Sequence, residues 1–164
     1  MKRLLALFAA LTILLSTGSA QKPSDDPQRL VGKTTPQLKV EEWITPAPTA
    51  RGTWMMFEIW ATWCSYCEEF VPRLNTIQAK LSDKVAIVAL SNEDPALIRQ
   101  FISSNAVKYP VARMAEGAIL KQLGVLIPGV PFVILYDPQG IVRWVGTPDT
   151  GTDSFVRWLE RIVR

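Results

Sequence analysis

The chain has 164 residues, a formal net charge of +3, two cysteines and no histidine. Histidine is the commonest metal ligand and the commonest general base, so its absence excludes Ser-His-Asp and Cys-His catalysis and His-ligated zinc or copper sites. Two cysteines are too few for a four-ligand zinc site, and the small net charge does not indicate a nucleic-acid partner. We therefore expect no metal and no cofactor.

Residues 1–20 have the pattern of a secretory signal peptide. Lys2 and Arg3 precede the apolar run Leu4–Leu15, and small residues follow up to Ala20. The run is shorter than the ~20 residues that span a bilayer, which favours cleavage after Ala20 over a membrane anchor. An uncleaved signal would still tether the protein. The sequence therefore predicts export to the periplasm or another extracytoplasmic space.

Residues 21–36 are polar and proline-containing, which predicts a flexible lead into one domain over residues 37–164. Leu38–Ile44 is expected to hold a short edge strand. Thr53–Trp60 is almost wholly apolar, aromatic or β-branched, which indicates a buried strand. Apolar residues three or four apart predict a helix over Cys64–Leu81.

The remaining chain continues as alternating strands and helices. Val85–Leu90 is apolar without alternation, as in strands buried on both faces of a parallel sheet. Further helices are predicted over Glu93–Ser104, Ala115–Leu123 and Asp153–Val163, and strands over Tyr109–Ala112, Phe132–Tyr136 and Ile141–Val145, the last two joined by the turn Asp137–Gly140. This order predicts an α/β fold with one mixed sheet and helices on both faces.

The two cysteines, Cys64 and Cys67, lie where the buried strand meets the helix. A helix N-terminus offers unpaired N–H groups and partial positive charge, which stabilise a thiolate and lower the thiol pKa. Cys64 would then be the exposed nucleophile, and Cys67, one turn along, the sheltered resolving sulfur. The alternative is a structural disulfide in a non-catalytic binding domain. A bridge across so short a loop stabilises little, which argues against that alternative.

Glu58 is the only charged residue in the run from Thr53 to Trp63. A lone acid in a buried strand is costly unless it is neutral or paired, and perturbed carboxylates cluster at functional sites. Glu58 is therefore a candidate catalytic residue. The alternative is that its side chain points outward at a sheet edge.

The stretch from Trp60 to Cys67 (WATWCSYC) resembles the active-site motif of the thioredoxin superfamily. Pro72 matches the proline that kinks the family's active-site helix, Val130-Pro131-Phe132 matches its cis-proline loop, and Gly146 matches a glycine beside its active site. A trans proline starting a strand is the alternative for Pro131. The resemblance runs from about residue 31 to the C-terminus and implies the thioredoxin fold, a mixed central sheet flanked by helices.

An extra helix and strand at about 93–113, together with the export signal, resemble the TlpA/ResA-like branch of that superfamily. The resemblance implies an enzyme that exchanges electrons with protein thiols or disulfides. That branch includes the reductases of cytochrome c maturation, so a reductase recharged by a membrane electron donor is expected, with a dithiol oxidase as the alternative. Without a second domain for dimerisation, we expect a monomer.

The same resemblance implies a role for each residue of the site. Cys64 attacks the substrate and Cys67 resolves the mixed disulfide. Glu58, beneath the second cysteine, takes the proton that Cys67 must lose. Trp60 is expected to lie mostly in the core and Trp63 to shield the disulfide. The alternative is that both are core aromatic residues. The partner's chain would be held as a short added strand by backbone groups of Gly129, Val130 and Pro131.

Overall fold

The computed structural model describes residues 24–34, 38–49 and 52–164, so the predicted signal peptide lies outside the described residues. In chain order the elements are η1 (Pro27–Leu30), β1 (Glu42–Trp43), β2 (Trp54–Ile59), α1 (Ser65–Leu81), β3 (Val85–Ser91), α2 (Pro95–Ser104), β4 (Val111–Arg113), α3 (Ala118–Leu123), β5 (Phe132–Tyr136), β6 (Val142–Gly146) and α4 (Ser154–Ile162). Within those ranges, none of the helices has the length and apolar content needed to cross a membrane.

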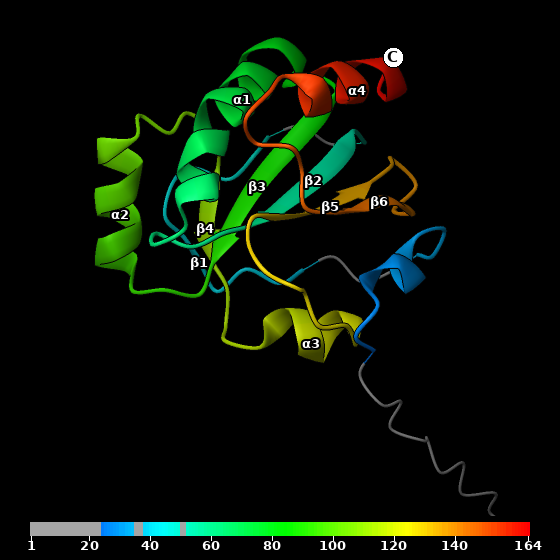
Figure 1. Cartoon of the computed structure of the whole chain (residues 1–164), viewed down its shortest axis with the longest axis horizontal. Helices are drawn as coiled ribbons and strands as arrows, with labels where there is room; N and C mark the ends of the chain where they lie inside the picture. Colours follow the sequence, from blue (N-terminus) through cyan, green and yellow to red (C-terminus); the bar gives the residue numbers. More distant parts are fainter. Residues whose placement is uncertain (1–23, 35–37, 50–51) are drawn as a thin grey trace, which may run out of the picture.

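The strands form one six-stranded mixed sheet in the order β1-β4-β3-β2-β5-β6. The three adjacent strands β4, β3 and β2 are parallel, and β1, β5 and β6 are antiparallel to their neighbours. Helices α1 and α4 cover one face of the sheet, and α3 with the N-terminal segment lies on the other (Figure 1). The predicted mixed α/β sheet with helices on both faces is therefore confirmed.

Strand β2 lies between β3 and β5 in the middle of the sheet, and its side chains alternate between the two faces. Met56 and Trp60 belong to the hydrophobic cluster under α1, whereas Phe57 and Ile59 belong to the cluster on the α3 side. By the same alternation Glu58 faces α1. A one-residue change of register would move the acid to the other face.

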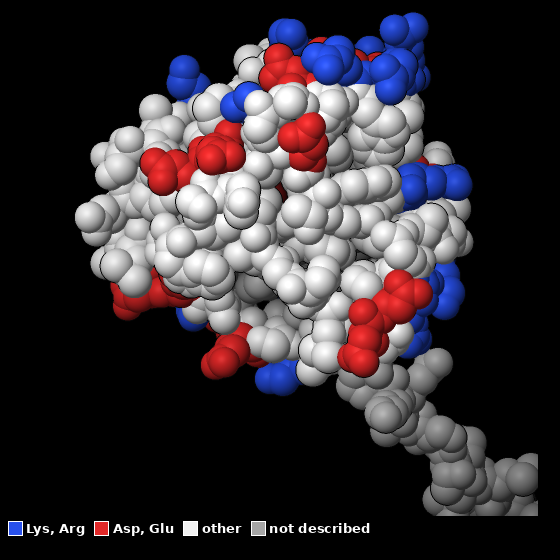
Figure 2. Space-filling view, in the orientation of Figure 1, with Lys and Arg blue, Asp and Glu red and all other residues white. Residues whose placement is uncertain are grey.

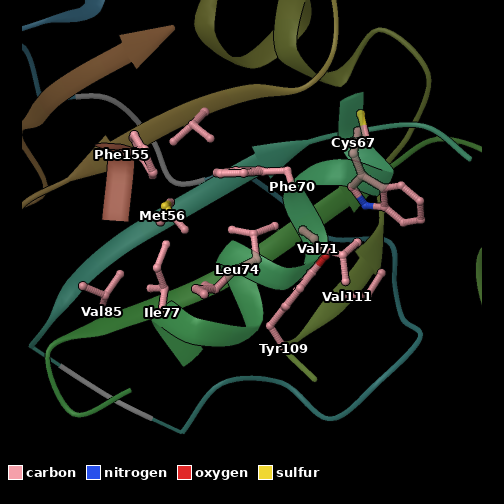
Figure 3. Packing of buried hydrophobic residues seen from close by; sticks show 14 of the residues in the cluster. Met56, Cys67, Phe70, Val71, Leu74, Ile77, Val85, Tyr109, Val111 and Phe155 are labelled. Atoms are coloured by element: carbon pink, nitrogen blue, oxygen red, sulfur yellow. The ribbon is translucent and has the colours of Figure 1, made fainter. Parts of the chain in front are cut away.

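Helix α1 is amphipathic as its sequence predicts. Phe70, Leu74 and Ile77 are fully buried at three- or four-residue intervals, and they pack over Met56 of β2 (Figure 3). Burying a side chain of this size stabilises a fold by about 1.5–3 kcal/mol. This packing fixes the position of the helix, and therefore of its N-terminal end, relative to the sheet.

The extra helix and strand predicted at about 93–113 are present as α2 and β4. The Asp94 carboxylate accepts the N–H of Ala96 at 2.7 Å, so α2 begins after an acidic cap with a proline in its first turn. Ile98 and Phe101 are buried in the cluster under α1, whereas Leu97 is 49% exposed.

Of the flexible lead predicted over residues 21–36, the structure describes residues 24–34, and these contact the domain. Leu30 is only 3% exposed. The N–H of Gly32 donates to the carbonyl of Val142 at 2.8 Å, which ties the segment to β6. The segment is polar in composition, but β6 is an edge strand whose free backbone groups accept a partner. Over these residues the chain is therefore packed against the domain.

Candidate active site

Cys64 and Cys67 are joined by a disulfide at the N-terminal end of α1, with their Cα atoms 5.2 Å apart. Cys64 is the N-cap residue, with extended backbone, and its Sγ accepts the N–H of Cys67 at 3.1 Å. The predicted junction of buried strand and helix is therefore present. In this disulfide form both residues are buried, Cys64 with 6% and Cys67 with 2% of their surface exposed.

The loop before β5 lies against the disulfide. The peptide bond between Val130 and Pro131 is cis, as the resemblance implies, and the Val130 carbonyl oxygen lies 3.4 Å from Cys64 Sγ. Gly129 is exposed beside it. The structure thus brings Gly129, Val130 and Pro131 together with the cysteine pair, although they are more than sixty residues away in the chain.

An apolar groove of about 310 Å³ adjoins the same loop. Fourteen residues line it, none of them charged: Ile59, Trp60, Ala61, Trp63, Asn92, Met114, Gly117, Ala118, Ile119, Leu120, Val125, Leu126, Ile127 and Val130. Val130 belongs both to the groove and to the surroundings of Cys64, so the groove opens next to the disulfide. The loop between α3 and β5 crosses a broad uncharged region of this face (Figures 1 and 2).

Three aromatic side chains flank the cysteines and differ sharply in exposure. Trp60 is 4% exposed and packs on Phe101 with ring centroids 4.6 Å apart, so it belongs to the core, as predicted. Trp63 is 76% exposed and Tyr66 is 63% exposed. Exposed aromatic residues of this size are typical of surfaces that contact a partner.

Glu58 is only 2% exposed. It pairs with Ala89 of β3 on one side and Val133 of β5 on the other, so the alternative of an outward-facing acid at a sheet edge is wrong. Among the described residues, no hydrogen bond or ion pair reaches its carboxylate. Burial without a partner disfavours the charged form and raises the pKa of Glu58 to about 8.

Tyr109 shares this interior and had no predicted role beyond starting a strand. Burial raises the pKa of its hydroxyl well above the ordinary value, and a negative charge on Glu58 raises it further. Its side chain lies in the cluster under α1, near Val71 and Val111 (Figure 3). No local sequence pattern could have paired Tyr109 with Glu58, because Tyr109 lies in the segment before β4 and Glu58 lies on β2, about fifty residues earlier in the chain.

Glu93 is a second residue that the sequence did not reveal. Its carboxylate accepts two hydrogen bonds from Thr62, which lies two residues before Cys64. The sequence did contain a signal for this contact. Glu93 lies just after the buried strand β3, and the carboxyl ends of parallel strands meet at one edge of a sheet, so Glu93 should lie near the loop that follows β2. In the part of the chain that the structure describes, no group of three or more acidic or cysteine side chains could hold a metal ion.

Comparison with known proteins places this geometry in a family. The AhpC/TSA family profile matches residues 31–145. The thiol-disulfide oxidoreductase ResA of Bacillus cereus is 29% identical over 153 residues, which cover 87% of each chain. The thiol:disulfide interchange protein DsbE of Pseudomonas fluorescens biotype C is 29% identical over 155 residues, covering 88% of this chain and 83% of its own.

Solved structures agree. A thiol-disulfide isomerase from Corynebacterium glutamicum superposes with a TM-score of 0.63 at 25% identity, covering 77% of this chain and 92% of its own. The thioredoxin domain of a thiol-disulfide oxidoreductase from Bacteroides vulgatus, at 18% identity, gives a TM-score of 0.68 over 82% of this chain and 98% of its own, which supports the thioredoxin-like fold. The chain therefore belongs to the AhpC/TSA family, and within it to the thioredoxin-fold thiol–disulfide oxidoreductases of the ResA/DsbE type.

Proposed function

We propose that this protein is an exported reductase of protein disulfides, with Cys64 as the attacking sulfur and Cys67 as the resolving sulfur. The observation that carries the proposal is the position of the pair. Cys64 is the N-cap of α1 beside a surface groove, and Cys67 lies one turn later in α1, on the buried side of the helix. A thiolate at the cap is stabilised by the helix N-terminus, which favours Cys64 as the nucleophile.

The reaction transfers two electrons. The Cys64 thiolate of the dithiol form attacks a substrate disulfide, forms a mixed disulfide and releases one substrate thiolate. Cys67 then loses its proton and attacks the Sγ of Cys64. This closes the Cys64–Cys67 disulfide and releases the second substrate thiol. The substrate disulfide is reduced and the enzyme dithiol is oxidised.

Glu58 is proposed as the group that accepts the proton of Cys67. It faces α1 from beneath, on the same side of the sheet as the cluster in which Cys67 is buried. Its pKa of about 8 lies close to that of a thiol, so proton transfer between the two is nearly balanced in energy. A carboxylate with an ordinary pKa would be too weak a base near neutral pH.

The substrate chain is proposed to bind across the loop of Gly129, Val130 and Pro131, beside Trp63. An extended peptide there would pair with backbone groups of the loop, which gives affinity without requiring one substrate sequence. The adjoining uncharged groove suits an apolar side chain near the substrate cysteine. The protein would bind its substrate as a monomer.

The direction of electron flow and the location rest on the predicted signal peptide and on the relatives named ResA and DsbE. Exported compartments are oxidising, so a reductase there must receive electrons from a membrane donor. Cytochrome c maturation, which requires reduced cysteines for haem attachment, is the proposed process. A dithiol oxidase would use the same residues with the opposite electron flow.

A trapping experiment tests the proposal. Cys67→Ala should arrest the reaction at the mixed disulfide, so partner proteins would accumulate on Cys64 as adducts that dithiothreitol releases. Cys64→Ala is the matched control and should capture nothing. Absence of adducts from the extracytoplasmic fraction would argue against a protein-disulfide substrate. In parallel, the redox state of the wild-type protein is measured in cells that are quenched with acid. The protein should be mostly in the dithiol form; a mostly oxidised population would identify an oxidase.

A further inference from the structure

We infer that Glu93 is a positioning residue of the active site, which holds the loop in front of Cys64 and sets the stability of the Cys64 thiolate through its negative charge. The inference rests on Cys64 being the attacking sulfur, as proposed above. It assigns a function to a carboxylate outside the cysteine pair, contributed by the segment between β3 and α2.

The carboxylate of Glu93 is held in place by three donors. One oxygen, Oε2, accepts the N–H of Thr62 at 2.6 Å and the hydroxyl of Ser91 at 3.0 Å. The other oxygen, Oε1, accepts the hydroxyl of Thr62 at 2.7 Å. Ser91 is fully buried at the end of β3, and its Oγ also accepts the N–H of Glu93 at 3.3 Å. The carboxylate is therefore fixed to the sheet on one side and to the active-site loop on the other.

This arrangement fixes the backbone that presents the nucleophile. Thr62 lies in the short loop between β2 and α1, and the next two residues are the exposed Trp63 and the N-cap Cys64. The N–H of Cys64 donates to the carbonyl of Ala61 at 3.2 Å. Hydrogen bonds to an ionised acceptor are stronger than bonds between neutral groups. The hydrogen bonds of Glu93 thus hold the loop between β2 and α1 at the carboxyl end of β3.

The charge of Glu93 is hydrogen-bonded but not neutralised. In the ranges that the structure describes, no lysine or arginine forms an ion pair with it. Two further acids lie on elements that adjoin the cysteine pair, Glu68 in the first turn of α1 and Glu58 on β2. Glu58 is buried, and its raised pKa of about 8 keeps it largely neutral below that pH. The loop 126–131 contributes no charged side chain.

A carboxylate near a thiolate destabilises it, in opposition to the N-terminal end of α1. Destabilising the thiolate favours the disulfide form over the dithiol form, so the dithiol becomes a stronger electron donor. The effect of Glu93 therefore has the direction that a reductase requires. Because only the charged thiolate senses it, the effect on the redox equilibrium should grow as the pH rises through the pKa of Cys64.

Two substitutions separate charge from geometry. Glu93→Gln keeps an acceptor oxygen for the Thr62 N–H and removes the charge, whereas Thr62→Val keeps the charge and removes one hydrogen bond. The rate of alkylation of the reduced protein is measured against pH, and peptide mapping assigns the label to Cys64. Glu93→Gln should move the midpoint of the Cys64 profile down by roughly 0.5–1 pH unit. Thr62→Val should move it much less.

Equilibration with glutathione gives an independent readout. Above the midpoint pH, Glu93→Gln should shift the equilibrium roughly three- to tenfold toward the dithiol, where tenfold corresponds to about 30 mV. Below the midpoint the two proteins should converge. Asp83→Asn, which changes the net charge equally beyond the far end of α1, should match wild type at every pH. Glu93→Asp retains the charge and should keep the midpoint close to wild type.

An unchanged Cys64 midpoint in folded Glu93→Gln would overturn the inference. An equal shift in Thr62→Val would also overturn it, because the effect would then come from loop geometry alone. If Glu93→Gln fails to fold, Glu93→Asp is measured in its place. Because aspartate retains the charge, a Cys64 midpoint displaced from wild type by roughly a full pH unit in this variant would count against the charge effect. Neither assay involves a physiological partner, so these outcomes are independent of the proposed reductase function. Faster labelling of Cys67 than of Cys64 would overturn the assignment of Cys64 as the attacking sulfur.

Discussion

At the scale of single residues, the buried Glu58 should make the stability of the protein depend on pH. In the folded protein burial raises its pKa from 4.5 to about 8, so the carboxyl keeps its proton across a range in which the unfolded chain has lost it. Over this window the folded state binds more protons than the unfolded state. The stability of the protein should therefore fall as the pH rises from about 4.5 to about 8.

Glu58→Gln should remove this component. The amide has a similar shape and no charge to bury, so the oxidised variant should be more stable than wild type at pH 8, by up to a few kcal/mol. The two proteins should have similar stability near pH 4.5. Urea unfolding of both oxidised proteins at several pH values measures the difference, in which contributions from all other groups cancel. Parallel stability curves would mean that Glu58 titrates normally.

The same variant tests the proposed proton transfer. Glu58→Gln cannot accept the proton of Cys67, so the resolving step should slow by about 10²-fold or more, as is usual when a general base is lost. The first attack by Cys64 should change much less. Stopped-flow measurement of both steps distinguishes them, and equal resolving rates in the two proteins would show that Glu58 has only a structural role.

At the scale of elements, the N-terminal segment 24–34 behaves as part of the domain. Its 3-10 turn, η1, places Leu30 in the hydrophobic cluster on the α3 side of the sheet. The side chain of Gln28 donates to the carbonyl of Val145 at 3.1 Å, which adds a second tie to β6. A short polar segment is thus ordered by one buried side chain and by the free edge of a strand.

Leu30→Ala should lower the free energy of unfolding by about 2–4 kcal/mol, because it leaves a cavity in a packed cluster. The neighbouring Val31 is 42% exposed, so Val31→Ala should change stability by less than ~0.5 kcal/mol. Denaturant unfolding of the two variants beside wild type measures both. Equal, small effects would show that this segment contributes nothing to the fold.

At the scale of the whole molecule, the first described residue after the predicted leader, Ser24, lies close to the groove beside the disulfide. Ser24 exchanges backbone hydrogen bonds with Gly124 and Leu126, and Leu126 lines the groove beside the disulfide. The chain therefore joins the domain on the α3 side of the sheet (Figure 1). A leader that remained in a membrane would hold this side of the protein close to it.

Cleavage of the leader gives a direct test of export. Mass spectrometry of the protein from an extracytoplasmic fraction should find a chain that begins at Gln21. Ala20→Phe should block cleavage, because the peptidase needs a small side chain there, and should leave the protein bound to the membrane. Full-length wild-type protein inside the cell would contradict the predicted signal.

The sequence by itself determined the order of strands and helices and the location of the cysteine pair. Apolar runs and helical spacing are local properties, and β2, α1 and β3 were each strong enough to be predicted within a residue or two. The burial of Glu58 followed from its apolar neighbours in the same strand. The polar composition of residues 21–36 predicted a flexible lead and did not indicate that Leu30 packs into the cluster on the α3 side of the sheet.

Only the tertiary structure decided which distant residues share the site. Thr62 and Glu93 are on different loops, and a separate segment brings Val130 to Cys64. Tyr109 reaches the surroundings of Glu58 in the same way. Contacts of this kind depend on sheet order and on strand register, which long-range packing selects. Local propensity and residue spacing act over a few residues and contain no information about which distant segments come into contact.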